Sequence, residues 1–92
     1  MIEHDVLSLP DVVLDFWAPW CQPCLALVPI VTRWETDGLV PVVRINVDTA
    51  PHLAAQFAVR SIPTLIRVQH GRELGRAVGS QPESALKQAL QL

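Results

Sequence analysis

The chain has 92 residues and a mass of 10.2 kDa, which predicts one domain over residues 1–92, because a separate hydrophobic core needs roughly 100 residues. Half of the residues are apolar and only 17% are charged, a composition that excludes a disordered chain. The net charge is −2 and the seven basic residues stand singly, so we expect no nucleic-acid partner.

The sequence contains no membrane span or secretory signal that we recognise. Its longest apolar run, residues 24–31, is eight residues long, whereas a helix that crosses a bilayer needs about 20. The first ten residues, MIEHDVLSLP, contain no lysine or arginine, and a secretory signal begins with a basic segment. We therefore expect no membrane partner and a cytoplasmic location.

Strands and helices are expected to alternate along the chain. The expected strands are 11–17, 39–47, 64–69 and 73–78, and the expected helices are 25–35, a helix with Pro51 in its first turn, and 83–92. Pro29 should kink the first helix. Asp48 or Thr49 should cap the second helix, and residues 80–83 should form a capping box for the third.

This order predicts an α/β fold with a mixed central sheet and helices on both faces. Two crossovers through helices should place parallel strands inside the sheet, and the hairpin at residues 70–72 should give it an antiparallel edge. Functional sites in open sheets form beyond the carboxyl ends of strands. The motif Cys21-Gln22-Pro23-Cys24 follows the first strand and is therefore expected at such an end.

The two cysteines are placed for chemistry more than for stability. A disulfide between Cys21 and Cys24 would enclose only two residues, so its loop-closure contribution is small. Cys21 falls at the start of a helix, where unpaired backbone N–H groups favour an anion, and its pKa should lie below the ordinary value of about 8.5. Thiolate is the attacking form in disulfide exchange, and Cys24, one turn later, can attack the mixed disulfide.

Zinc binding is the alternative for a C-x-x-C motif. A structural zinc ion needs four ligands, and the only candidates besides the cysteines are His4, His52 and His70. None of these histidines is near the pair in sequence. We therefore expect no metal, and disulfide exchange by the two cysteines needs no bound cofactor.

Several motifs together resemble the thioredoxin family. They are DFWAPWCQPC at 15–24, Pro29, RINVD at 44–48, SIPT at 61–64 and AVGS at 77–80, and they occur in the family's order over residues 11–92. The resemblance implies a thioredoxin-like fold and a thiol–disulfide oxidoreductase that reduces protein disulfides. Cys21 would be the nucleophile and Cys24 the resolving thiol. The partners would be disulfide-containing protein substrates and a disulfide reductase as electron donor.

The resemblance also assigns a proton acceptor. Asp15 would be the buried carboxylate that takes the proton from Cys24, and burial raises a carboxyl pKa toward the working pH.

A substrate-binding surface is implied as well. Pro63 would follow a cis peptide bond and face the cysteines, and Ile62 would offer its backbone to an extended substrate. Trp20 would flank the site as an apolar contact surface, and Gly79 would leave room for the bound peptide.

Three residues depart from the family pattern near the site. Gln22 replaces a usual glycine, and because Gln22 and Pro23 tune the thiolate, the redox potential stays open. A disulfide oxidant or isomerase is therefore an alternative. Arg44 replaces a lysine near Asp15 and should hold that carboxylate more firmly ionised. Leu25 replaces a lysine and removes a positive charge from the rim.

The largest departure precedes the first strand. The family has a strand and a helix there, whereas about ten residues precede position 11 in this chain, so residues 2–9 should supply either the strand or a remnant of the helix. The fold is thus expected to be shortened at its N-terminus, with apolar surface left open for a homodimer or another partner. A non-catalytic binding module on the same fold is a further alternative.

Overall fold

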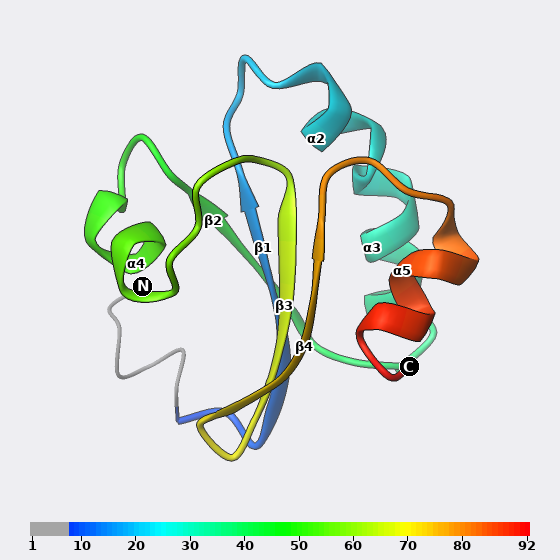
Figure 1. The fold of residues 1–92 in the computed structure, drawn as a ribbon. Coiled ribbons are helices and arrows are strands. Elements are labelled where there is room, and N and C mark those ends of the chain that lie inside the picture. The colour runs from blue at the N-terminus through cyan, green and yellow to red at the C-terminus, as the bar shows by residue number, and fades with distance from the viewer. Residues whose placement is uncertain (1–7) are drawn as a thin grey trace.

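A four-stranded sheet forms the centre of the structure, a computed structural model that describes residues 8–92 (Figure 1). The strands are β1 (Asp11–Trp17), β2 (Val42–Asn46), β3 (Thr64–Gln69) and β4 (Arg72–Val78). The helices are α2 (Gln22–Ala26), α3 (Val28–Thr36), α4 (Pro51–Gln56) and α5 (Glu83–Ala89). The predicted strands 11–17 and 64–69 are confirmed residue for residue.

The sheet is mixed, with the strand order β2-β1-β3-β4. β1 and β2 are parallel and place Asp15 opposite Arg44, whereas β1–β3 and β3–β4 are antiparallel. The mixed sheet and the final hairpin are confirmed, but the expectation of parallel strands inside the sheet is wrong. After α4, residues 57–63 carry the chain back to the end of the sheet where β2 finished, so β3 runs in the opposite direction (Figure 1).

Helices cover both faces of the sheet, with α4 on one side and α3 and α5 on the other (Figure 1). Successive residues of β1 point to opposite faces, and five of its seven residues are buried. Leu14 and Phe16 pack on the α4 side with Leu53, while Val13 packs on the other side with Trp34 and other residues. This double burial explains why five of the seven residues of β1 are apolar, the exceptions being Asp11 and the buried Asp15.

The predicted helix 25–35 is two helices. Leu27 separates α2 from α3, and Pro29 lies in the first turn of α3. A proline in a first turn removes a backbone N–H that has no intrahelical partner, so it is tolerated there. Pro29 therefore starts a helix, and the predicted kink is wrong.

Both predicted N-terminal caps are also wrong. The N-cap residues of α4 and α5 are Ala50 and Pro82, and neither makes a side-chain cap hydrogen bond. Asp48 instead accepts a hydrogen bond from the indole of Trp20. Glu83 accepts from the side chains of Arg33 and Trp34 and so connects α5 to α3.

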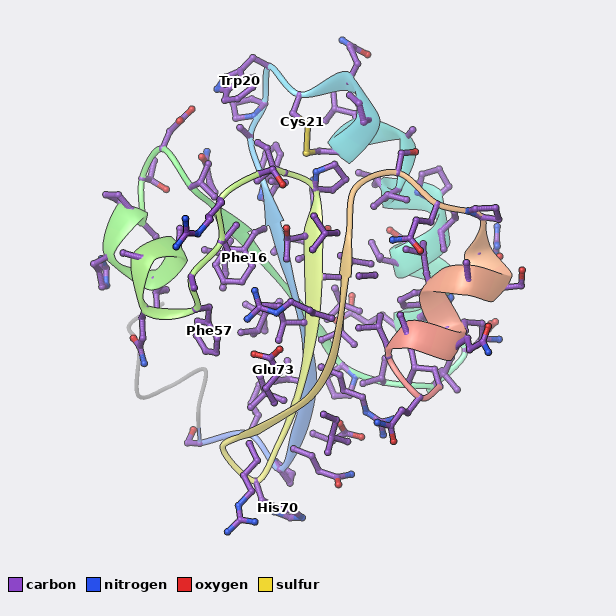
Figure 2. The ribbon with its side chains drawn as sticks, viewed as in Figure 1. Phe16, Trp20, Cys21, Phe57, His70 and Glu73 are labelled. Atoms are coloured by element: carbon purple, nitrogen blue, oxygen red, sulfur yellow. A yellow bond between two sulfur atoms is a disulfide. The ribbon has the colours of Figure 1, made fainter. Side chains whose placement is uncertain are left out.

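Two arginines of the sheet fasten the helices on its two faces. Arg67 forms an ion pair with Asp11 and donates to the carbonyls of Leu90 and Gln91, just beyond α5. Arg76 forms an ion pair with Glu73 and donates to the carbonyl of Phe57, just beyond α4. Phe57 also packs on Phe16 with ring centroids 5.9 Å apart (Figure 2).

The prediction for residues 2–9 falls almost entirely outside the described part of the chain. No helix within residues 8–92 is long and apolar enough to cross a membrane.

Candidate active site

The connections β1–α2, α4–β3 and β4–α5 meet at one end of the sheet (Figure 1). Trp20 and Cys21 lie at this end, beyond the last residue of β1 (Figure 2). The cysteine motif therefore occupies the position expected for it, past the carboxyl end of a strand.

Cys21 and Cys24 are joined by a disulfide bond, with their Cα atoms 5.2 Å apart. Cys21 is the N-cap of α2, and its Sγ accepts a 3.2 Å hydrogen bond from the backbone N–H of Cys24. Cys21 is 5% exposed and Cys24 is fully buried, so Cys21 is the residue of the pair that solvent reaches. Gln22 and Pro23 between them are exposed, and Pro23 lies in the first turn of α2.

An apolar cradle surrounds the pair. Ala18 is buried with the two cysteines, and Trp17, Val47 and Ile62 pack against them. This cradle keeps water away from Cys24 and leaves Cys21 at its rim. No cluster of histidine, cysteine or carboxylate side chains in residues 8–92 is placed to hold a metal ion.

The peptide bond between Ile62 and Pro63 is cis, as the resemblance implied. The carbonyl of Pro63 accepts a 2.8 Å hydrogen bond from the N–H of Gly79, which ties the α4–β3 and β4–α5 connections together. Gly79 has a φ of +85°, and a Cβ atom added there would meet no other heavy atom within 4 Å. The left-handed backbone favours glycine, and the space in front of it is open.

Trp20 is 66% exposed, and its Nε1 donates a 2.9 Å hydrogen bond to Oδ2 of Asp48. The sequence pattern favours Asp48 only as a helix cap and does not indicate this contact. The available signal was an aspartate directly after the strand parallel to β1, which ends at the same edge of the sheet as the cysteine motif.

Exposed apolar side chains gather near the pair. Among residues 8–92, the large hydrophobic side chains that remain exposed are Trp20, Leu25, Leu39 and Val78. Trp20 and Leu25 flank the C-x-x-C motif in sequence, and Val78 precedes Gly79. Val78 is not recognisable in the sequence as a residue of the site, because a valine in a strand pattern does not show whether its side chain is exposed.

Asp15 is buried beneath this end of the sheet. It lies on the same face of β1 as Val13 and Trp17, the face covered by the helices that follow the cysteines. Neither carboxylate oxygen has a hydrogen-bond partner in the described residues. Nε of Arg44 lies 3.5 Å from Oδ2, close enough for an ion pair but without hydrogen-bond geometry.

Burial decides the proton affinity of Asp15. It raises the pKa of the carboxyl from 3.8 to about 6, although the positive charge of Arg44 acts in the opposite direction. Arg44 is partly exposed and its guanidinium stacks over the ring of Trp17, with 4.1 Å from Cζ to the ring centroid. Arg44 therefore lowers the pKa of Asp15, the direction expected of a charge that favours the carboxylate, but burial outweighs it.

Comparison with known proteins identifies the family. The family model "Thioredoxin" matches residues 3–92. The chain is 41% identical to a thioredoxin of Synechocystis sp. over 97% of the chain and 86% of that protein. It is 43% identical to a thioredoxin of Haemophilus influenzae over 82% of the chain and 72% of that protein.

Solved structures give the same result. A mutant thioredoxin from Halobacterium salinarum NRC-1 superposes with a TM-score of 0.80 at 32% identity, covering 95% of this chain and 80% of that one. Mitochondrial thioredoxin 3 from Saccharomyces cerevisiae, in its oxidised form, superposes with a TM-score of 0.82 at 27% identity, covering 96% and 83%. The chain belongs to the thioredoxin family, and its Cys21–Cys24 pair makes it a dithiol reductase of protein disulfides.

Proposed function

We propose that Cys21 attacks the disulfide of the substrate and that Cys24 resolves the resulting mixed disulfide. The observation that carries this assignment is the asymmetry of the pair: only Cys21 is reached by solvent, and its sulfur accepts the N–H of Cys24. In the reduced protein the same N–H is placed to donate to the sulfur of Cys21, and a hydrogen bond to the charged form favours the thiolate.

The reaction balances without a cofactor. The Cys21 thiolate forms a bond to one substrate sulfur, and the other substrate sulfur leaves as a thiolate. The Cys24 thiol loses its proton and attacks Sγ of Cys21, which releases the second substrate thiolate. The two substrate thiolates take up two protons, so the substrate gains two electrons and the protein ends as the disulfide.

Asp15 is the proposed acceptor of the Cys24 proton. It is supported by its burial on the face of β1 that α3 and α5 cover, and by a pKa raised to about 6. A carboxylate with that pKa is mostly ionised at neutral pH and is still a stronger base than an exposed aspartate. In the buried site, the Asp15 carboxylate is a better acceptor of the thiol proton of Cys24 than a water molecule is.

The substrate segment is proposed to bind across Trp20, Ile62, Pro63 and Gly79, as an extended strand beside the backbone of Ile62. Support comes from the open space in front of Gly79 and from the exposed apolar side chains around the pair. Gln22 and Pro23, both exposed, are proposed to tune the potential through the thiolate of Cys21.

The electron donor is proposed to be a disulfide reductase, and the proposed compartment is the cytoplasm. The chain holds two cysteines in total, both in the redox pair, and a reducing compartment keeps such a pair in the dithiol form.

The homodimer stays a prediction. The hydrophobic residues of β1 that face α4 are buried, so association needs another surface, and a clean monomer in sedimentation at high concentration would contradict it.

Trapping tests the assignment of the two cysteines. Reduced Cys24→Ser should accumulate a mixed disulfide with a disulfide-bonded peptide, because the attack still occurs and resolution does not. Cys21→Ser should form none, and mass spectrometry distinguishes the two results. Equal trapping by both variants would overturn the assigned order.

The reduction potential separates the reductase from its alternatives. Equilibration of the Cys21–Cys24 pair against a thiol buffer should give about −270 mV for a reductase. A value near about −180 or −120 mV indicates an isomerase or an oxidant. A chain whose double serine variant keeps all partner binding and cellular activity would be a non-catalytic module.

A further inference from the structure

A groove runs from the active site toward α4. It has a volume of about 410 Å³ and is lined by Trp20, Val47, Ala54, Val59, Arg60, Ser61 and Ile62. Trp20 and Ile62 belong to the site already described, so the groove continues that surface. Most of its lining is apolar, and within residues 8–92 Arg60 is the one charged residue in the lining.

Arg60 differs from the arginines that fasten the fold. Arg33, Arg44, Arg67 and Arg76 each form an ion pair with a carboxylate. Arg60 is exposed and has no hydrogen bond or ion pair to any residue in the described range 8–92. The groove therefore presents a guanidinium that forms no ion pair with a carboxylate of residues 8–92.

The position of Arg60 in the chain places this charge next to the proposed substrate path. Arg60 lies two residues before Ile62, in the connection that ends at the cis Pro63. Two residues of extended chain span about 7 Å, so the charge falls opposite a substrate residue about two or three positions from the attacked cysteine.

We propose that Arg60 selects protein disulfides that carry an acidic side chain about two residues from the attacked cysteine. This inference rests on the proposed function, because it concerns the substrate of the same dithiol pair. The apolar lining accommodates uncharged side chains of many shapes. The guanidinium of Arg60 adds a preference for substrate side chains of negative charge. Carboxylates are attracted by the guanidinium and ammonium groups are repelled.

Matched peptide disulfides test the proposal. Each substrate is a symmetrical dimer in which two copies of an otherwise uncharged peptide are joined by a disulfide between their single cysteines. In the three dimers of a set, the residue two positions from the cysteine is Glu, Gln or Lys. A second set carries the same residues on the other side of the cysteine. Stopped-flow fluorescence of the reduced protein gives the second-order rate constant for each dimer.

The wild-type protein should reduce the Glu dimer about 2- to 5-fold faster than the Lys dimer in at least one set, the range expected for an exposed ion pair. Raising the ionic strength from about 0.01 M to about 1 M should remove most of the preference, because the Debye length falls from about 30 Å to about 3 Å. Arg60→Gln should bring the ratio near one, and Arg60→Glu should invert it.

Arg72→Gln is the matched control, since Arg72 is also exposed and lies in the hairpin at the opposite end of the sheet. It should keep the wild-type ratio. A ratio that is unchanged in Arg60→Gln, or that falls equally in Arg72→Gln, overturns the role of Arg60. A wild-type protein that reduces neither the Gln dimers nor the uncharged 2-hydroxyethyl disulfide instead contradicts the proposed function, so the two failures are distinguishable.

Discussion

The indole of Trp20 and the carboxylate of Asp48 are joined by a 2.9 Å hydrogen bond across 28 positions of the sequence. Trp20 is 66% exposed, so packing alone does not fix its ring. The bond connects the β1–α2 and β2–α4 connections and holds the indole at the mouth of the groove beside Cys21. Asp48 thus positions an apolar contact surface without touching the reacting sulfurs.

Removing this bond should affect protein substrates more than small ones. Asp48→Ala frees the indole, so we expect the rate of reduction of a peptide disulfide to fall about 2- to 5-fold, while the free energy of unfolding changes by about 1 kcal/mol or less. Comparison of rates for a peptide and for 2-hydroxyethyl disulfide checks this. Asp37→Ala is the control, because Asp37 is exposed and its side chain bonds to nothing in residues 8–92. Equal slowing of both substrates would count against a positioning role.

Asp15 should make the oxidised protein less stable at neutral pH than at acidic pH. Its pKa is raised from 3.8 to about 6 by burial, so the folded state binds more protons than the unfolded state between these values. The contribution of Asp15 to the free energy of unfolding therefore falls as the pH rises through this interval, by up to about 3 kcal/mol, and is level above it.

An uncharged side chain at position 15 should abolish the loss of stability that ionisation of Asp15 causes at neutral pH. Asp15→Asn should match the wild type near pH 4 and exceed its stability at pH 7 to 8, with urea unfolding at each pH as the measurement. The same variant should slow the resolution of the mixed disulfide, because the proton acceptor is gone. Stability curves that run parallel across the pH range would contradict the raised pKa.

Arg44 should set how far the pKa of Asp15 rises. Its charge lowers that pKa against the effect of burial, so Arg44→Gln should move the pKa above its value of about 6. NMR titration of the Asp15 carboxyl in the oxidised protein measures the shift. Arg44→Lys separates charge from stacking, since it keeps the charge and loses the planar contact with Trp17. A pKa that drops in Arg44→Gln would show that Arg44 acts through structure and not through its charge.

The elements that packing dictates were predictable from the sequence, and those that depend on long-range polar contacts were not. β1 is recognisable in the sequence because both of its faces are buried and its residues, apart from Asp11 and Asp15, are apolar. The predicted caps of α4 and α5 were wrong because Asp48 and Glu83 bind side chains that are distant in the sequence, Trp20 and Trp34. Capping rules consider only residues close in the sequence. The predicted direction of β3 was wrong for a similar reason. A short helix followed by a loop can return the chain to either end of a sheet, and the sequence does not show which.

The candidate site divides in the same way. Cys21 and Cys24 are recognisable from spacing and position, and the resemblance to a family supplied Asp15 and Pro63. The unpaired charge of Arg60 became visible only when the partners of the other arginines were known, because nothing in the sequence distinguishes Arg60 from Arg33, Arg67 or Arg76. Pairing is a property of the folded chain.

Gly75 should be the least replaceable of the four glycines. It lies in β4 beside a break in register with β3, and a Cβ atom added there would collide with the backbone carbonyl of Ala89 at the end of α5. Backbone cannot move aside like a flexible side chain, so Gly75→Ala should lower the free energy of unfolding by about 1 to 3 kcal/mol. Gly38→Ala is the comparison, because its added Cβ meets no atom within 4 Å and only its φ of +72° resists substitution. Urea unfolding of the two variants should rank Gly75→Ala as the more damaging, and the reverse order would mean that α5 shifts away from the sheet without loss of stability.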